Sequence, residues 1–173
     1  MVRVLCLLSL LCLLSACAST RPATPREITQ VTAWKMWGRV VIHTTHESRS
    51  ANFYWEQHDQ DYHIDVFGLL GLGGVSLVGS PGRAELTDSY HHHYRAASPE
   101  ALMQQQLGWA MPVSDLFYWV RRLPAPNHST TSQDWVIYYD SEQSLRGLTW
   151  PKKMRIEAHD VSIIFIIHEV ELL

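Results

Sequence analysis

The residue types best suited to chemistry in this 173-residue chain are three consecutive histidines, a glycine-rich loop and the serines. His91 and His93 would share one face of a strand and could hold zinc, but no carboxylate or cysteine stands at a supporting ligand spacing. The loop from Gly68 to Gly74 lacks a lysine, and we expect a strand after it instead of the helix that a phosphate site needs. No serine lies in a Gly-x-Ser-x-Gly elbow. We therefore expect no metal, no cofactor and no enzymatic activity.

The three cysteines, Cys6, Cys12 and Cys17, all lie close to the amino terminus. Because no cysteine follows, the folded part cannot contain a disulfide scaffold, a zinc-thiolate site or a cysteine nucleophile. Residues 1–16 combine one positive charge with an apolar run, which predicts a cleaved secretory signal. The four residues that end at Cys17, Leu-Ser-Ala-Cys, resemble the bacterial lipobox, in which the cysteine becomes acylated. The alternative is an ordinary signal peptide with a chance cysteine.

Acylation of Cys17 would hold the protein at a membrane, since two or three acyl chains give a stable anchor. Ala18 and Ser19 follow the cysteine, without the aspartate that commonly retains such lipoproteins in the inner membrane. We therefore expect a lipid anchor in the outer membrane, facing the periplasm. Residues 17–33 are expected to be the lipidated cysteine and a flexible tether, and residues 34–173 a single folded domain.

Composition limits the classes of folded domain. Hydrophobic residues make up 46% of the chain and charged residues 18%, which argues against a disordered protein. The net charge of -3 argues against a nucleic-acid partner, because such proteins usually carry a basic excess.

Alternating apolar and polar residues, separated by turn residues, predict a mainly β fold. Short turns at residues 59–60, 81–82 and 159–160 predict three hairpins whose apolar residues all face the same side. The predicted cross-strand pairs are Trp55 with Ile64, Phe53 with Val66, Leu77 with Leu86, Ile163 with Ile156, and Phe165 with Met154. The predicted strands are 34–45, 50–57, 62–67, 74–80, 83–87, 92–96, 135–140, 152–158 and 161–169. A curved antiparallel sheet around one apolar concavity accounts for this pattern.

Two short helices are predicted between the strand blocks. Ser98 can cap the first helix, Pro99 suits its first position, and Gly108 can end it. The second helix carries a stripe that must be buried: Val113, Leu116, Phe117 and Val120. Either the helices complete an ordinary core, or they form a lid over a cavity.

Two further segments leave alternatives open. Residues 163–167 are apolar on both faces of a strand, so both faces are covered or one lines a cavity. The glycine-rich loop displays Leu69 and Leu70, which either fold back into the core or enter a membrane.

The order and spacing of several fragments resemble the LolB family, the outer-membrane lipoprotein receptors of the bacterial lipoprotein-localisation pathway. These fragments are Trp34 to Gly38, Phe53 to Gln57, Tyr62 to Gly71, Leu77 to Leu86, Leu107 to Val113, Trp119 to Pro126, and Trp135 to Pro151. The chain departs from the family pattern in a short segment at residues 127–133 and in having Leu69 where a proline is common.

The resemblance implies an incomplete antiparallel β-barrel with a short-helix lid over an apolar cavity. It also implies a monomeric, non-enzymatic receptor that accepts acylated lipoproteins from a soluble periplasmic carrier of the LolA type and inserts them into the lipids of the outer membrane. Leu70 matches the membrane-inserting leucine, with Leu69 beside it. The alternative is a structural or interaction lipoprotein of the envelope with a filled β core.

From the predicted registers and the helix stripe, we expect one set of side chains to line the acyl cavity. Its members are Phe53, Trp55, Ile64, Val66, Leu77, Leu102, Leu116, Phe117, Val120, Ile163 and Phe165.

Overall fold

The structure is a computed structural model that describes residue 25 and residues 27–68, 73–126 and 135–173. A short 3-10 helix, η2 (Ile28–Gln30), precedes the sheet, and two α-helices, α2 (Pro99–Leu107) and α3 (Val113–Trp119), stand between its two strand blocks. The strands are β1 (Ala33–His43), β2 (Ser48–His58), β3 (Asp61–Phe67), β4 (Val75–Ser80), β5 (Arg83–Thr87), β6 (His93–Ala96), β7 (Val136–Leu145), β8 (Leu148–Ala158) and β9 (Val161–Leu172).

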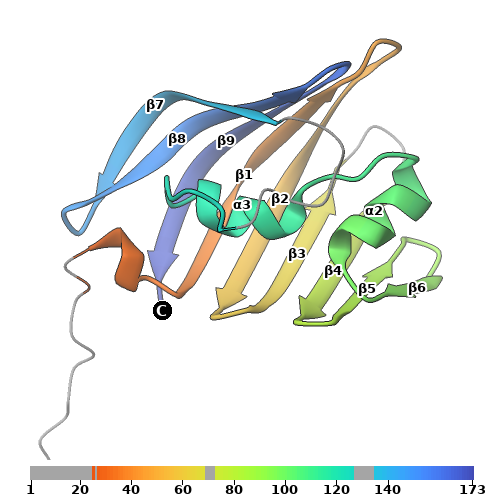
Figure 1. Cartoon of the computed structure of the whole chain (residues 1–173), viewed down its shortest axis with the longest axis horizontal. Coiled ribbons are helices and arrows are strands. Elements are labelled where there is room, and N and C mark those ends of the chain that lie inside the picture. The colour runs from red at the N-terminus through yellow and green to blue at the C-terminus, as the bar shows by residue number, and fades with distance from the viewer. Residues whose placement is uncertain (1–24, 26, 69–72, 127–134) are drawn as a thin grey trace, which may run out of the picture.

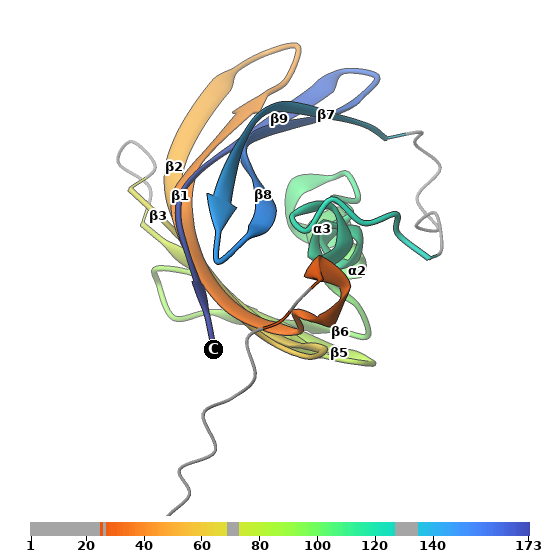
Figure 2. The ribbon, with the colours of Figure 1, turned by 90° about the vertical axis from the view of Figure 1, so that its left-hand side faces the viewer.

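The nine strands form one antiparallel sheet in the order β6-β5-β4-β3-β2-β1-β9-β8-β7. Figure 1 shows both α-helices on one face of this sheet, and Figure 2 shows the strands in an open arc around α3. Within the described residues β6 and β7 remain free edges that do not pair with each other, so the barrel is not closed. The expected mainly β fold with a short-helix lid over an incomplete barrel is confirmed.

The three predicted hairpin registers are present. Trp55 pairs with Ile64, and Phe53 pairs with Val66. The pairs in the other two hairpins also agree with the prediction: Leu77 with Leu86, Ile156 with Ile163, and Met154 with Phe165. Because side chains alternate along a strand, these pairs place their apolar members on the face that carries the helices.

The hairpin of β7 and β8 is longer than predicted. Arg146 and Gly147 have φ angles of 51° and 79°, which make a tight turn between Leu145 and Leu148. Apolar and polar residues do not alternate regularly on either side of this turn, which polar residues precede and Pro151 follows. The prediction therefore ended β7 too early, at residue 140, and began β8 too late, at residue 152.

The core lies between the sheet and the helices in two clusters. The larger cluster joins β1, β2, β8, β9 and α3, while the smaller one joins β4, β5, α2 and the first residue of α3. Ile64 of β3 packs against both clusters. The interior is therefore continuous from one edge of the sheet to the other.

Packing begins before the expected end of the tether at residue 33. Val31 is 2% exposed and belongs to the larger cluster, and Ile28 packs against it. The segment is held because the Val31 carbonyl accepts a hydrogen bond from Arg121 Nη1 at 2.8 Å. Residues 1–16 and Cys17 lie outside the described residues. None of the described helices is long and apolar enough to cross a membrane.

Gly38 in β1 has no room for a side chain. A Cβ atom there would lie 2.0 Å from the Ile166 carbonyl oxygen, where the register between β1 and β9 shifts. We expect Gly38→Ala to lower the free energy of unfolding by about 2 kcal/mol or more, because backbone atoms of β9 must move. Urea denaturation measures this change.

Gly82→Asn is the control for the glycine substitution. Gly82 has a φ of 78° with open space around it, and asparagine tolerates this conformation. Its expected cost is below about 1 kcal/mol. Equal costs at Gly38 and Gly82 would contradict the close approach of β1 and β9.

Candidate functional site

Local interactions fix the two lid helices against each other. Ser98 Oγ accepts a hydrogen bond from the Ala101 N–H at 3.2 Å, which caps α2, and Gly108 ends it with a φ of 81°. The backbone N–H of Ser114 in α3 donates to Glu100 Oε1 of α2 at 2.7 Å. Since Pro112 supplies no side-chain cap to α3, Glu100 performs this role from the neighbouring helix.

The side chains expected at the acyl cavity all lie in or against the interior clusters. Ile64, Val66 and Phe117 are half-buried, and the others are buried: Phe53, Trp55, Leu77, Leu102, Leu116, Val120, Ile163 and Phe165. They come from β2, β3, β4, β9 and both helices. Residues widely separated in the sequence thus share one apolar interior.

A pocket of about 260 Å³ opens between this sheet face and the helices. Its lining includes Trp55, Tyr62, Ile64, Phe117 and Tyr118. The volume falls below the range of about 300–1,000 Å³ that is usual for small-molecule sites. This pocket is therefore small in this conformation, and the aromatic side chains of Trp55, Phe117 and Tyr118 border it.

Trp34 and Trp150 are buried aromatic residues that were not among those expected at the cavity. The Trp34 ring stacks on Phe117 with centroids 5.2 Å apart, and it lies 6.1 Å from Trp55 and 6.0 Å from Trp150. Trp34 and Trp150 are both fully buried. The alternation of Trp34, Met36 and Val40 along β1 was the available signal for this cluster.

Several interior donors lack an acceptor among the described residues. They are Nε1 of Trp34, Trp135 and Trp150, and the hydroxyl of Tyr62. Burial, together with the nearby charge of Glu100, raises the pKa of Tyr62. A buried donor without a partner costs about 1–3 kcal/mol, so a ligand that supplies acceptors at these positions would gain affinity.

Arg121 is a buried cation, only 3% exposed, that sequence reasoning missed. Its guanidinium lies 4.0 Å from the centroid of the Phe117 ring, and its Nε donates to the Phe117 carbonyl at 3.0 Å. Burial lowers the pKa of Arg121. With its bond to Val31, Arg121 ties the end of α3 to the segment before β1. Arg121 follows Phe117 by four residues, the spacing at which side chains are neighbours on a helix, so the sequence could have indicated this contact.

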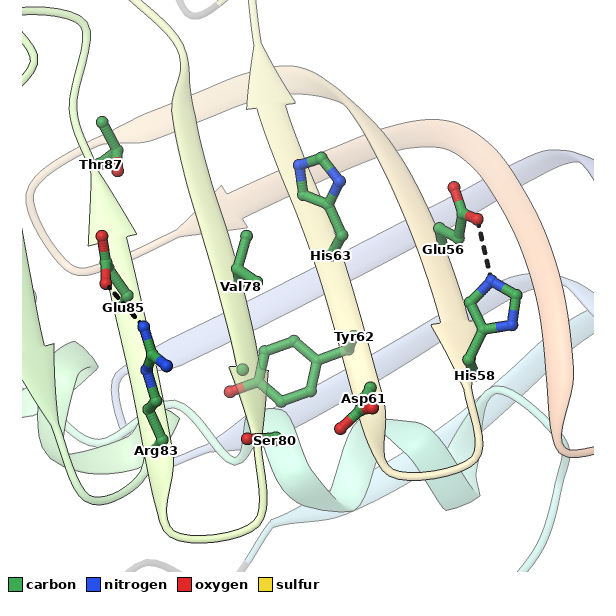
Figure 3. A pocket seen from close by; sticks show the side chains of 11 residues that line it. Glu56, His58, Asp61, Tyr62, His63, Val78, Ser80, Arg83, Glu85 and Thr87 are labelled. Atoms are coloured by element: carbon green, nitrogen blue, oxygen red, sulfur yellow. Dashed lines mark hydrogen bonds and ion pairs between the residues drawn. The ribbon is translucent and has the colours of Figure 1, made fainter.

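The opposite face of the sheet is polar. Figure 3 shows a second pocket there, of about 750 Å³, whose lining includes Glu56, His58, His63, Arg83 and Glu85. Charged groups of both signs in open contact with water do not suit hydrocarbon chains. The apolar face beneath the helices is the better candidate site.

The expected membrane loop begins where β3 ends. Leu69 and Leu70 lie outside the described residues. Phe67, at the end of β3, is 46% exposed, and Gly68 has a φ of 78°. The chain therefore leaves the sheet with an exposed aromatic side chain.

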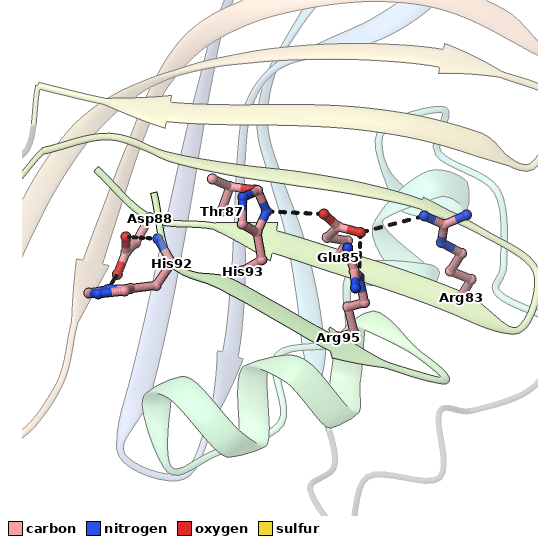
Figure 4. A network of polar contacts seen from close by, with 7 residues as sticks. All are labelled: Arg83, Glu85, Thr87, Asp88, His92, His93 and Arg95. Atoms are coloured by element: carbon pink, nitrogen blue, oxygen red, sulfur yellow. Dashed lines mark hydrogen bonds and ion pairs between the residues drawn. The ribbon is translucent and has the colours of Figure 1, made fainter. Parts of the chain in front are cut away.

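The histidine run forms polar contacts with nearby acids (Figure 4). His92 Nδ1 lies 2.9 Å from Asp88 Oδ2, and His93 Nδ1 lies 3.1 Å from Glu85 Oε1. Among the described residues, no three or more histidine, cysteine or acidic side chains are grouped as metal ligands.

Glu85 should contribute to stability in a pH-dependent way. Hydrogen bonding and charge from Arg95, with further bonds from Arg83 and His93, hold the pKa of Glu85 at about 2, below its ordinary 4.5. A lowered carboxyl pKa stabilises the fold above pH 4.5, and this stabilisation is lost as the pH falls toward 2.

We expect Glu85→Gln to be less stable than the parent protein at pH 7, and this difference to disappear between about pH 4.5 and pH 2. Urea denaturation at a series of pH values measures it. A difference of the same size at both ends of the series would show that the charge of Glu85 does not matter.

Comparison with known proteins agrees with this architecture. A family model described as "Outer membrane lipoprotein LolB" matches residues 32–169. The outer-membrane lipoprotein LolB of Pseudomonas fluorescens is 32% identical over 156 residues, which cover 83% of this chain and 76% of the relative. The LolB protein of Pseudomonas paraeruginosa is 33% identical over 165 residues, with 88% and 80% covered.

A solved structure shows likeness of fold alone. The crystal structure of a DUF1329 family protein from Desulfovibrio piger has a TM-score of 0.51 and 6% sequence identity, and the match covers 84% of this chain and 87% of that one.

The family match and the LolB relatives cover most of the chain, and the chain therefore belongs to the LolB family of outer-membrane lipoproteins.

Proposed function

We propose that this protein is an outer-membrane receptor that takes acylated lipoproteins from a soluble periplasmic carrier and inserts them into the outer membrane. The observation that carries the proposal is the continuous apolar interior between the open sheet and the two helices. Membership of the LolB family favours this role over the alternative of an envelope structural lipoprotein with a filled core.

The energetics of the cargo require an enclosed apolar route. A triacyl group has roughly 45 methylenes, and at about 0.8 kcal/mol each its exposure to water would cost on the order of 30 kcal/mol. Transfer should therefore run from the carrier's cavity to this interior and then to the bilayer, without a solvated step. No covalent chemistry and no cofactor are needed for this route.

The small pocket implies that the helices move when acyl chains enter. Helix α3 covers the sheet through side chains such as Phe117, which stacks on Trp34, and Leu116. Side-chain packing can rearrange without breaking the backbone ladder of the sheet. We therefore place the acyl chains between the inner sheet face and α3, in space that Phe117 occupies in this conformation.

The interior hydrogen-bond donors that lack an acceptor are suited to the polar part of an acylated cysteine. An acylated cysteine carries ester and amide carbonyl groups, which accept hydrogen bonds, beside its hydrocarbon chains. The Tyr62 hydroxyl borders the pocket, and Trp34 lies directly behind Phe117. These donors could bind the carbonyl groups while the aliphatic and aromatic side chains hold the methylenes.

Delivery would use Cys17 and the loop of Leu69 and Leu70. The acylated Cys17 keeps the receptor at the outer membrane, where its clients must arrive. The loop leucines enter the bilayer and bring the interior close to the lipid. A carrier of the LolA type, the client lipoproteins through their acyl chains, and outer-membrane lipids are the proposed partners of a monomeric receptor.

A transfer assay tests the proposed function. A client lipoprotein bound to the periplasmic carrier is mixed with this protein, and association of the client with each protein is measured with and without lipid vesicles. We expect the client to leave the carrier only when it is acylated, and then to enter the vesicles. Equal transfer of the unacylated client would contradict a receptor for acyl chains.

A further inference from the structure

Several large apolar side chains are exposed among the described residues, and three of them lie toward one end of the molecule. Tyr90, in the turn between β5 and β6, is 77% exposed. Phe67, at the end of β3, is 46% exposed, and Leu107, the last residue of α2, is 48% exposed. Large apolar groups held in water lower solubility unless something apolar meets them.

Contacts around the glycine loop bring Phe67 and Tyr90 to the same end of the molecule. A Cβ atom at Gly73 would lie 2.0 Å from Ser89 Cβ, so the turn that bears Tyr90 packs directly on the base of the loop. A Cβ atom at Gly74 would lie 3.4 Å from Phe67 Cβ. Phe67 and Tyr90 therefore flank the same short segment.

The last turn of helix α2 lies toward the end of the molecule that carries Phe67 and Tyr90. Strand β5 runs toward the turn at Asp88, β6 returns from it, and α2 then runs back along them. Figures 1 and 4 show the carboxyl end of α2 on the side of this turn. Leu107, as the last residue of α2, thus lies toward the same side as the turn.

The turn presents Tyr90 by an ordered set of hydrogen bonds. Asp88 Oδ1 accepts from the backbone N–H groups of Tyr90 and His92, each at 2.9 Å. The His91 N–H donates to the Asp88 carbonyl at 3.0 Å, and His91 has a φ of 64°. These bonds hold the backbone of Tyr90 and of the two residues after it, so its side chain projects from a defined turn.

We propose that Phe67, Tyr90 and Leu107 form a membrane-contact face that docks this end of the receptor on the bilayer surface. The proposal rests on the proposed function, because it gives the insertion loop a rigid base. Tyrosine suits the boundary between lipid and water, where its ring meets apolar groups and its hydroxyl stays hydrated. Residues 88–93 contain no lysine or arginine, so the contact depends on apolar burial and little on salt.

We expect the bilayer to meet this face, because LolB proteins are outer-membrane lipoproteins and the tether is long enough for the face to reach the membrane. The segment from Cys17 to Ile28 can extend about 36–40 Å. Thr32 accepts a hydrogen bond from the Asp59 N–H at 2.8 Å, so the tether joins the body near the start of β3. The seven residues of β3 span roughly 20 Å, which this reach exceeds.

Site-specific fluorescence on the lipidated protein tests this face. With Cys17 acylated and residues 1–16 removed, as we expect, no free cysteine remains, so Tyr90→Cys supplies a single thiol for an environment-sensitive probe. The labelled protein is placed in phosphatidylethanolamine and phosphatidylglycerol vesicles that contain a nitroxide lipid. Tyr138→Cys on β7 is the matched control, because Tyr138 is an aromatic residue 41% exposed on another part of the surface.

We expect nitroxide quenching about threefold or more stronger at position 90 than at position 138, because interfacial residues lie within 5–10 Å of the acyl boundary. Phe67→Cys should behave like position 90. The difference should persist in high salt. Equal quenching at positions 90 and 138 would overturn the proposal.

Measurements of uptake and delivery distinguish a failure of the proposed contact face from a failure of the proposed receptor function. Tyr90→Ser should slow delivery to vesicles several-fold and leave uptake from the carrier unchanged. If position 90 is quenched but the protein takes no client from the carrier, the contact face stands and the receptor role fails. If uptake and delivery proceed while position 90 stays in water, the receptor role stands and the contact face is wrong.

Discussion

Leu70→Glu should leave uptake of acylated clients unchanged and slow their delivery to the membrane by about tenfold or more. Burial of a leucine side chain contributes about 1.5–3 kcal/mol, and a glutamate at the same depth adds the cost of desolvating a charge. The substitution changes none of the residues that we expect at the acyl cavity, so acyl binding should persist. Uptake is measured by transfer from the carrier, and delivery by the appearance of the client in vesicles.

Val136→Glu is the control for the loop substitution. Val136 is 48% exposed at the start of β7, opposite Glu157 of β8, so a new carboxylate there stays in contact with water. Its delivery rate should match that of the parent protein. If Leu70→Glu also delivered at the parent rate, the loop would have no part in membrane insertion.

Val66→Glu should reduce uptake of acylated clients by about 100-fold. Val66 faces the interior, where it pairs with Phe53 and packs against the larger cluster. An uncompensated charge beside the acyl chains would cost about 3 kcal/mol in binding, and each 1.4 kcal/mol is a factor of ten. Because Val66 is half-buried, the carboxylate can reach water in the empty protein, so the fold should survive.

Val78→Glu is the matched control on the opposite face. Val78 lies in β4, 49% exposed, and pairs with His63 and Glu85. The substitution should leave uptake unchanged. Circular dichroism and a urea transition on both variants separate loss of binding from loss of fold. Equal uptake by folded Val66→Glu and parent protein would exclude this part of the interior from acyl binding.

The sequence predicted the parts of the fold that local rules determine. Two-residue turns set the register of Trp55 against Ile64 and of Phe53 against Val66, because a hairpin with a short turn allows few pairings. Ser98 and Gly108 set the bounds of α2 because capping is local. The inward set of side chains followed from the alternation along each strand.

The parts it missed depend on contacts between distant segments. The stack of Trp34 on Phe117 and the bond from Arg121 to Val31 join residues about 80–90 positions apart, which no periodicity records. The packing of the interior also depends on side-chain volumes from several strands at once. The residues expected at the cavity lie together, and the pocket of about 260 Å³ that some of them line is a volume that no sequence pattern records.

Photo-crosslinking tests most directly the claim that acyl chains enter between the sheet and the helices. A benzophenone amino acid replaces Phe117, which borders the inner pocket, or Tyr138, which lies on the outer face. Each protein receives an acylated client from the carrier and is then irradiated. We expect crosslinks to the client's acyl chains from position 117 and none from position 138. Crosslinks from position 138 alone, or equally from both positions, would contradict it.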